Sequence, residues 1–193
     1  MAGTLIDRAG MPRCRRCKLR EVACFCESVQ SLNLPFEVHI LLHPLELKRP
    51  SSSVFFLQLD SQVNVHLYQR TELITPQPGD ALLYPESVET SSVHLDSLTT
   101  ASLRIKRLWL LEGTWQEAAK MLAKQPLIAS LPRISVSDQE SRYPFRKNQR
   151  GDGLSTAEAL LASIDDEYRQ DRNRYYDCYL RHAVASMNGH APC

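Results

Sequence analysis

The amino-acid sequence predicts an α/β fold, with a mostly parallel sheet and helices on both of its faces. The first observation is a series of short apolar or alternating runs, which are typical of strands. The second is that helical segments fall between these runs, and this alternation is the pattern of a parallel sheet. The third is the turn chemistry between runs, as in Thr75 to Gly79, which holds two prolines and a glycine. The predicted strands cover residues 36–43, 63–67, 80–84, 108–111 and 132–137.

Length and composition favour one soluble domain with a small appendage. The chain has 193 residues, 43% of them hydrophobic, and a formal net charge of +1. An RNA site would therefore have to use local basic patches rather than a global field. No apolar run of about 20 residues is present, so no membrane span is expected. The N-terminus lacks the apolar core of a signal peptide, which makes the cytoplasm the expected compartment.

Several common ligand sites are disfavoured by the sequence. There is no Gly-x-Gly-x-x-Gly and no Walker loop, so a dinucleotide or nucleoside triphosphate site is not expected. His39 and His43 have a ligand-like spacing, but on a strand they lie roughly 13 Å apart, which is too far to share a metal. The other histidines are isolated in the sequence, so a histidine metal site is not predicted.

Four cysteines lie close together near the N-terminus, as Cys14-x-x-Cys17 and Cys24-x-Cys26. In a reducing compartment such thiolates are more often metal ligands than disulfides, and four of them complete a tetrahedral zinc site. No coordination position remains open for a substrate, so the expected Zn²⁺ is structural. The predicted organisation is a tail and zinc knuckle over residues 1–33, followed by a catalytic domain over residues 34–193.

Basic residues surround this knuckle, and two interpretations stay open. They can be solvated charges that ease thiolate formation, or they can form a patch that contacts phosphates. The residues are Arg13, Arg15, Arg16, Lys18 and Arg20.

A loop and a short helix follow the first predicted strand. Arg49-Pro50 precedes three serines, Ser51 to Ser53, and the apolar run Val54 to Leu57 is the expected buried side of the helix. The favoured interpretation is that the serines cap this helix. The alternative is that their hydroxyls donate to a cofactor or a phosphate.

The stretch from Leu108 to Met121 is the most informative part of the chain. The run Leu108 to Leu111 suits a buried strand, and Glu112-Gly113 then breaks it. Thr114 and Glu117 form a capping box, so a helix is expected to start there and to run toward Pro126. The first amides of that helix have no internal partner, which suits an anionic group such as the carboxylate of an amino-acid-like ligand.

A second helix start has the same chemistry. Ser155 and Glu158 form another capping box after a glycine-containing turn, and the two helix starts are expected to converge on one ligand. One final helix is predicted from about Thr156 to beyond Leu180. Core packing or a dimer seam explains its apolar stripe, so monomer and homodimer both stay open. The stripe consists of Leu161, Ile164, Tyr168, Tyr175 and Tyr179.

A basic stretch with two aromatic residues precedes this second helix start. Cations can bind phosphates while rings stack on bases, so this stretch is the best nucleic-acid candidate; an exposed loop is the competing interpretation. Its candidate RNA-binding residues are Arg142, Tyr143, Arg146, Lys147 and Arg150.

Several of these motifs together resemble the DTW-domain family. Glu112-Gly113-Thr114-Trp115, followed by Ala118 and Met121, is similar to the family's Asp-(small)-Thr-Trp motif. The stretch from Leu154 to Ala159 is similar to its Leu-Ser-Thr-x-Glu-Ala motif, and the paired cysteines also fit. The sequence departs from the family in two places: Glu112 replaces Asp, and Ser-Ser-Ser follows Arg49-Pro50 where Asn-Thr-Gly is expected.

The resemblance implies a SPOUT-like knotted enzyme with a C-terminal trefoil knot. Such enzymes would use S-adenosylmethionine to transfer its 3-amino-3-carboxypropyl group to a tRNA uridine. Glu112 would be the catalytic carboxylate that accepts the uridine N3 proton, and its other role would be to face the positive end of the helix. Arg49 would contact RNA together with the basic stretch. The implied cofactor-binding residues are Tyr84, Pro85, Gly113, Thr114, Trp115, Leu154, Ser155, Thr156 and Ala157.

Three of these assignments have competing interpretations. Tyr84-Pro85 can simply end a strand, and Trp115 can be a core residue. The alternative functions are a knotted RNA methyltransferase and a non-catalytic zinc-knuckle RNA-binding protein.

Overall fold

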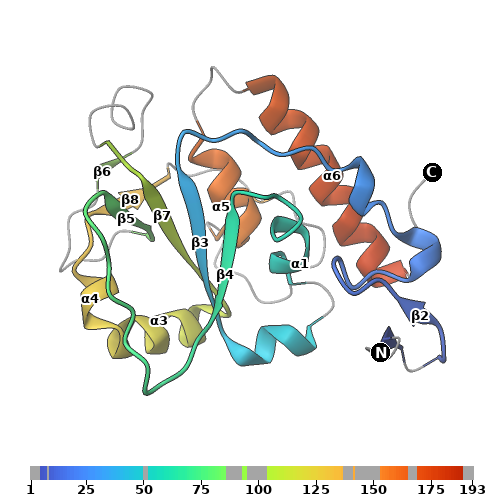
Figure 1. The fold of residues 1–193 in the computed structure, drawn as a ribbon, viewed down its shortest axis with the longest axis horizontal. Coiled ribbons are helices and arrows are strands. Elements are labelled where there is room, and N and C mark those ends of the chain that lie inside the picture. The colour runs from blue at the N-terminus through green and yellow to red at the C-terminus, as the bar shows by residue number, and fades with distance from the viewer. Residues whose placement is uncertain are drawn as a thin grey trace.

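The protein is described by a computed structural model in which residues 5–7, 9–49, 52–85, 93–94, 104–136, 141, 153–164 and 169–188 are placed. A six-stranded sheet runs through its centre in the order β4-β3-β7-β5-β8-β6 (Figure 1). Every pairing described in this sheet is parallel. The strands are β3 (Glu37–Leu42), β4 (Val63–Leu67), β5 (Asp80–Leu83), β6 (Val93–His94), β7 (Arg107–Glu112) and β8 (Arg133–Ser135).

Each of the five predicted strands has a counterpart in this sheet, and β6 was not predicted. β7 lies between β3 and β5 and is buried from Leu108 to Glu112, which explains its unbroken apolar run. β4 forms one edge of the sheet and is only half-buried, in agreement with its alternating sequence. The predicted mostly parallel α/β sheet is therefore confirmed.

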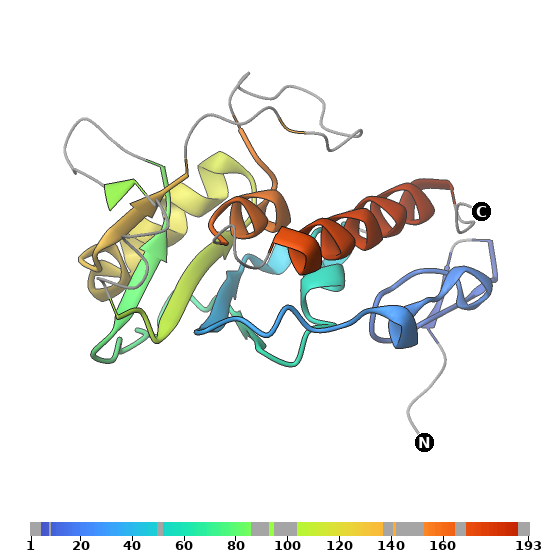
Figure 2. The same cartoon turned by 90° about the horizontal axis from the view of Figure 1, so that it is seen from above.

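Helices cover both faces of the sheet, as predicted (Figures 1 and 2). On one face, α3 (Trp115–Lys124) and α4 (Pro126–Ala129) pack against Trp109 and Leu111 of β7. On the other face, Leu108 and Leu110 pack into a core that also contains residues of three further helices. These helices are α1 (Val54–Leu57), α5 (Thr156–Ala162) and α6 (Arg169–Asn188).

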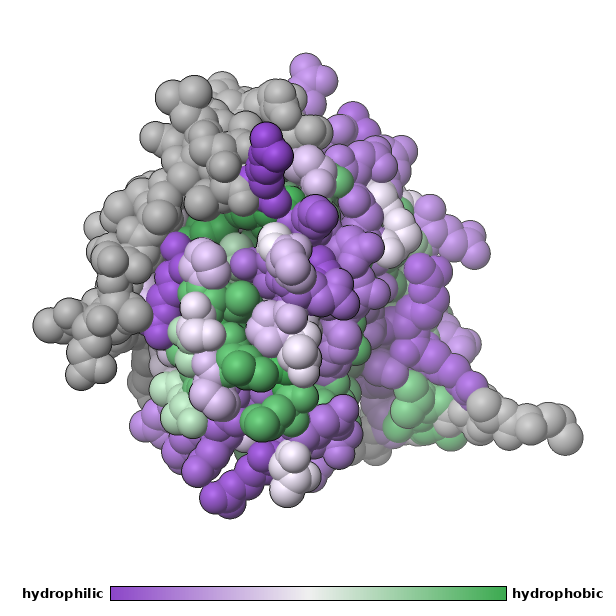
Figure 3. Space-filling model, turned by 60° about the vertical axis from the view of Figure 1, so that its left-hand side comes forward, coloured by the Kyte–Doolittle hydropathy of each residue, from purple (hydrophilic) through white to green (hydrophobic). Residues whose placement is uncertain are grey.

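The surface near α4 and the outer strands mixes polar and apolar side chains, with an apolar area at its centre (Figure 3). No helix within the described residues is both long enough and apolar enough to cross a membrane.

The N-terminal segment lies against the end of α6, far from the outer strands of the sheet (Figure 1). It contains β1 (Leu5–Ile6) and β2 (Pro12–Arg13), which pair antiparallel, so part of the expected tail is a small hairpin. Three short 3₁₀ helices follow along the chain: η1 (Glu21–Ala23), η2 (Cys26–Ser28) and η3 (Pro44–Lys48).

The prediction of one long final helix is wrong. α5 ends at Ala162, and α6 is a separate helix that begins at Arg169. At the end of α5 the Ser163 hydroxyl donates to the carbonyl of Leu160, so a side chain binds a backbone acceptor at this helix end. Leu161, Ile164, Tyr175 and Tyr179 are buried in the core, which confirms core packing for the described part of the stripe; Tyr168 lies outside the described residues.

The trefoil knot stays a prediction. Residues 137–140 and 142–152, which join β8 to α5 apart from Ser141, lie outside the described part of the chain. The same holds for most of residues 86–105, where a loop or short helix was expected and where Val93–His94 forms β6.

Candidate active site and metal centre

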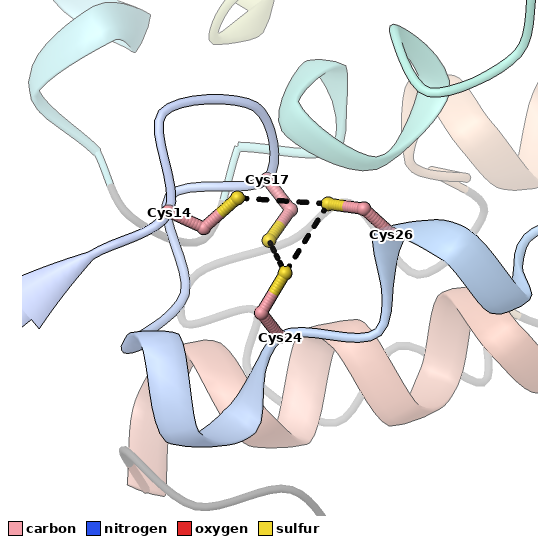
Figure 4. A group of neighbouring side chains, drawn as sticks. All are labelled: Cys14, Cys17, Cys24 and Cys26. Carbon is pink, nitrogen blue, oxygen red and sulfur yellow. Dashed lines mark hydrogen bonds between the residues drawn. The ribbon is translucent and has the colours of Figure 1, made fainter.

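The four N-terminal cysteines point toward one another (Figure 4). Their sulfur atoms all lie within 4.8 Å of each other, with 3.7 Å between Cys14 and Cys26 and 3.8 Å between Cys17 and Cys24. Tetrahedral zinc with Zn–S bonds of about 2.3 Å places its sulfurs about 3.8 Å apart. The four side chains therefore fit the predicted structural Zn²⁺ site.

The loop also favours a thiolate at one of its cysteines. Burial raises the pKa of the Cys14 thiol, but hydrogen bonds from the amides of Cys17 and Arg16 outweigh it and lower that pKa to about 7. Burial raises the pKa of Cys26 to about 11. A bound zinc ion would itself hold all four sulfurs deprotonated.

Most of the basic residues around the knuckle make internal contacts. Arg20 Nε donates to Asp7 at 2.8 Å, and Arg13 forms an ion pair with the same carboxylate at 3.5 Å. Arg13 also donates to the carbonyl of Lys18, whose own Nζ donates to the carbonyl of Arg15. For Arg13, Lys18 and Arg20 these contacts favour a structural role over a free phosphate patch.

Glu112, the predicted catalytic carboxylate, ends β7 and is only 5% exposed. The Ser52 hydroxyl donates to its Oε1 at 2.8 Å, and the Ser53 hydroxyl donates to its Oε2 at 3.0 Å. The expectation that these serines cap the helix is wrong for Ser53, because it precedes α1 without a side-chain cap hydrogen bond. The hydroxyls instead hold both oxygens of Glu112.

Arg49 binds two other glutamates, one of which, Glu46, lies near Glu112. Its Nη1 and Nη2 donate to the two oxygens of Glu117 at 2.9 and 3.0 Å, and Nη1 also donates to Glu46. The Arg49 hydrogen bonds lower the pKa of Glu117 to about 2, with help from the amide of Thr114. The RNA-binding role of Arg49 stays a prediction, and its described partners are carboxylates.

The surroundings of Glu46 raise the pKa of its carboxyl group, whereas those of Glu117 lower it. Burial raises the pKa of Glu46, and the nearby charge of Glu112 raises it further. Arg49 therefore binds two carboxylates, and a third, Glu112, lies near one of them. Carboxyl groups whose pKa is perturbed in this way are frequent at active sites, where they accept or release protons.

Gly113 is required for space rather than for an unusual backbone angle. A Cβ atom there would lie 3.1 Å from Cβ of Glu117 and 3.4 Å from Cβ of His43. Any larger side chain would push Glu117 away from Arg49. His43 Nδ1 also lies 3.5 Å from Glu117 Oε1, which adds a titratable ring to this edge of the cluster.

The predicted cofactor-binding residues Tyr84 and Trp115 contact each other edge to face, with ring centroids 6.2 Å apart. Trp115 is 39% exposed, so the alternative that it is a core residue is wrong; Trp109 is the buried tryptophan, at 2%. The guanidinium of Arg133 lies over the Tyr84 ring at 5.6 Å. Tyr84 and the exposed Pro85 follow β5, while Trp115 is the first residue of α3, so the pair lies at the carboxyl ends of the strands.

Both predicted capping boxes are confirmed. Thr114 and Glu117 exchange side-chain and backbone hydrogen bonds at the start of α3. Ser155 and Glu158 do the same at the start of α5, directly before Thr156 and Ala157 and after Leu154.

α6 holds this second helix start. Glu158 accepts hydrogen bonds from the hydroxyls of Ser141 and Tyr176, and Tyr179 donates to the Ser155 hydroxyl at 3.0 Å. α3 and α5 both contact β7, but they lie on opposite faces of the sheet. Their convergence on one ligand stays a prediction.

The predicted RNA-binding stretch lies outside the described residues, which applies to Arg142, Tyr143, Arg146, Lys147 and Arg150. Sequence reasoning missed Glu46 and the role of Glu117 beyond capping. It also missed that Ser52 and Ser53 bind Glu112. The only available signal was the position of the serines in a motif that departs from the family pattern.

The comparisons with known proteins agree with these motifs. The DTW domain model matches residues 11–182. The chain belongs to the DTW domain family. It is similar to tRNA-uridine aminocarboxypropyltransferase 2 of Drosophila melanogaster, with 27% identity over 172 residues. The aligned region covers 79% of this chain and 65% of that relative, so the chain spans slightly less than two thirds of the relative's length. No solved structure matches it.

The two departures from the DTW motifs contact each other in this structure. Glu112 is one methylene longer than the usual Asp, and the residues that bind it are the short side chains of Ser52 and Ser53. Two hydroxyl donors from the altered serine motif therefore bind the longer acid, so the two departures meet in one hydrogen-bonded arrangement. The altered motif therefore keeps a hydrogen-bonded carboxylate at the end of β7.

Proposed function

We propose that this DTW protein is a tRNA-uridine aminocarboxypropyltransferase, which transfers the 3-amino-3-carboxypropyl group of S-adenosylmethionine to N3 of a tRNA uridine. The observation that carries the proposal is the hydrogen-bonded acid of the DTW motif, Glu112, at the carboxyl end of a central parallel strand. Ligands of open α/β sheets bind at that edge. The family match and the name of the Drosophila relative support the choice of reaction.

The residues present suit such a cofactor. Two capped helix starts, at Thr114 and Ser155, offer amides for a carboxylate, and the exposed Trp115 with Tyr84 offers aromatic surface for a base. When bound, S-adenosylmethionine would supply an electrophilic carbon beside its sulfonium. Transfer forms an N3–C bond, breaks an S–C bond and leaves methylthioadenosine.

The proton on uridine N3 has to leave as the new bond forms. We assign this acceptor role to Glu112, with Ser52 and Ser53 fixing its orientation. The raised pKa of Glu46 makes it the next group in a path for that proton. Arg49 limits the repulsion among the three carboxylates by binding Glu46 and Glu117.

The test is incubation of the purified full chain with tRNA and S-adenosylmethionine, followed by analysis of both products. Methylthioadenosine and an aminocarboxypropyl uridine in digested tRNA are the expected products. Release of S-adenosylhomocysteine with a methylated nucleoside would instead identify a methyltransferase. RNA binding without cofactor binding would identify a non-catalytic RNA-binding protein.

Comparison of nucleosides from cells with and without the gene would identify the modified uridine. We also propose that Cys14, Cys17, Cys24 and Cys26 bind structural Zn²⁺ and that the protein acts in the cytoplasm.

A further inference from the structure

The zinc knuckle is connected to Glu112 through α1. At one end of this helix, Gln58 Nε2 donates to the carbonyl of Arg16, which lies between the first two cysteines. Lys18 Nζ lies over the ring of Phe55, 5.8 Å from its centroid. At the other end of α1, Ser52 and Ser53 donate to Glu112.

α1 is able to transmit a displacement because it has no freedom to absorb one. It is only four residues long, and each of them, Val54 to Leu57, is at most 2% exposed. Close-packed interiors transmit strain rather than deform. A shift of the Arg16 carbonyl would therefore move the serines that orient Glu112.

A second connection runs through α6. His182 Nε2 lies 2.9 Å from the carbonyl oxygen of Cys17, and because a carbonyl only accepts, the ring donates. The imidazole is 2% exposed and contacts the rings of Phe25 and Phe56. Less than one helical turn earlier, Tyr179 donates to Ser155 at the start of α5.

Both acceptors on the knuckle are main-chain carbonyls, of Arg16 and Cys17, within the Cys14-x-x-Cys17 turn. Metal coordination fixes the shape of such a turn, and a loop of this size does not hold its shape by packing alone. Loss of the metal would leave the buried imidazole N–H of His182 without its acceptor, which is costly for a buried group, and would release the more exposed Gln58 amide.

We propose that the four-cysteine knuckle positions both helix-start sockets of the candidate site, with α1 linking it to Glu112 and α6 linking it to Ser155. Zinc bound at the knuckle thereby controls the geometry of a site that lies across α1 and less than one helical turn away along α6. The assignment of Glu112 and Ser155 to a cofactor site rests on the proposed function; the mechanical connection does not.

Hydrogen exchange on the full chain, zinc-loaded and after mild chelation, tests the connection directly. Chelation is expected to speed amide exchange about tenfold for residues 52–58 and 153–160, the change that loss of one buried hydrogen bond produces. Residues 126–129, which form α4 on the other face of the sheet, serve as the internal reference. A change confined to residues 14–28 would overturn the proposal.

A variant that keeps all four cysteines distinguishes this connection from global unfolding on chelation. His182→Leu removes the donor, whereas His182→Gln keeps an N–H donor. With zinc content unchanged, His182→Leu is expected to speed exchange at residues 153–160 and to weaken S-adenosylmethionine binding about tenfold. His182→Gln should restore much of the slow exchange at residues 153–160 and much of the affinity for S-adenosylmethionine. Arg181→Ala, which changes the exposed neighbouring residue on α6, is the matched control.

Gln58→Ala gives the same test through α1 if His182→Leu does not fold. Its expected effect is faster exchange at residues 52–58. If amide exchange is unchanged in every variant and S-adenosylmethionine still binds normally, the connection between knuckle and site is contradicted and the proposed function is kept. If chelation changes exchange at the site but the wild-type protein binds no S-adenosylmethionine, the connection is kept and the proposed function is contradicted.

Discussion

The two ends of β7 carry two buried polar clusters with opposite electrostatic design. At the amino end, Asp80 accepts two hydrogen bonds from Arg107 at 2.7 Å and one from the indole of Trp109 at 2.8 Å. At the carboxyl end, Glu112 lies near Glu46, and Arg49 binds Glu46 and Glu117. The first cluster pairs one acid with one base, and the second joins two carboxylates to one guanidinium with a third carboxylate close by.

This difference indicates which end of the strand serves stability and which serves chemistry. Arg107 lowers the pKa of Asp80 despite its burial, so that carboxylate stays ionised and fully hydrogen-bonded. The pKa of Glu46, the neighbour of Glu112, is in contrast raised, first by burial and then by the charge of Glu112, and perturbed carboxyl groups of this kind are frequent at active sites. The unbalanced cluster also lies at the edge of the sheet where ligands of α/β proteins bind.

The largest expected effect is at the balanced end. Asp80→Asn should lower the free energy of unfolding by about 4 kcal/mol, because it leaves Arg107 buried without its counter-charge. Denaturant unfolding measures this change. Asp171→Asn, in an exposed pair with Arg174, is the control and should cost less than about 1 kcal/mol. Equal losses in the two variants would remove the distinction between the clusters.

Glu112→Gln should act on turnover rather than on folding. The amide keeps the size of the side chain and one acceptor for the Ser52 and Ser53 hydroxyls but cannot take a proton. The rate of methylthioadenosine release should fall about a hundredfold or more, with cofactor affinity little changed. If Glu112→Gln still turns over, Glu112 is not the base and Glu46 becomes the candidate. Glu46→Gln then tests that role.

Acid should weaken the carboxyl-end cluster through Glu117. Its pKa in the folded protein is about 2, below the ordinary value of 4.5. Its contribution is therefore present above pH 4.5 and is lost as the pH falls toward 2. Glu117→Gln should cost about 2 kcal/mol at neutral pH and should flatten the acid limb of the stability profile. If the fall in stability at acid pH is the same in Glu117→Gln as in the wild type, the Arg49–Glu117 pair contributes little to the free energy of unfolding.

The smallest effect is expected at the two departures from the family motifs, Glu112 and the serines that bind it. Glu112→Asp shortens the acid and should lose about 1 kcal/mol as its bonds to Ser52 and Ser53 lengthen. Ser52→Asn extends the donor and should recover part of that loss in the Asp variant while destabilising the Glu form. A double-mutant cycle measures the coupling, expected at about 1 kcal/mol. Strict additivity would show that the two departures are independent.

Local chemistry made part of this structure predictable from sequence. Each capping box depends on residues three apart, Thr114 with Glu117 and Ser155 with Glu158, so the spacing alone was sufficient. The cysteine cluster was predictable for the same reason. The apolar run of β7 indicated a strand buried on both faces, which its position between β3 and β5 explains.

Contacts between distant strands were not predictable. The amide of His43 bonds the carbonyl of Glu112 because β3 and β7 pair in parallel, and no local pattern encodes that pairing. Parallel pairing also brings His39 Nδ1 within 2.9 Å of His66 Nε2 across β3 and β4, although His66 was isolated in the sequence and His39 was considered only with His43. The family resemblance identified Glu112 as important but gave no reason to connect it with Ser52.

The strand order has a consequence for synthesis of the chain. β7 lies between β3 and β5, yet it is made after both of them. Until residues 107–112 leave the ribosome, β3 therefore has one unpaired edge, and β5 has two because β8 is made later still. Such edges readily pair with other chains, so this interval is when the newborn protein most needs a chaperone.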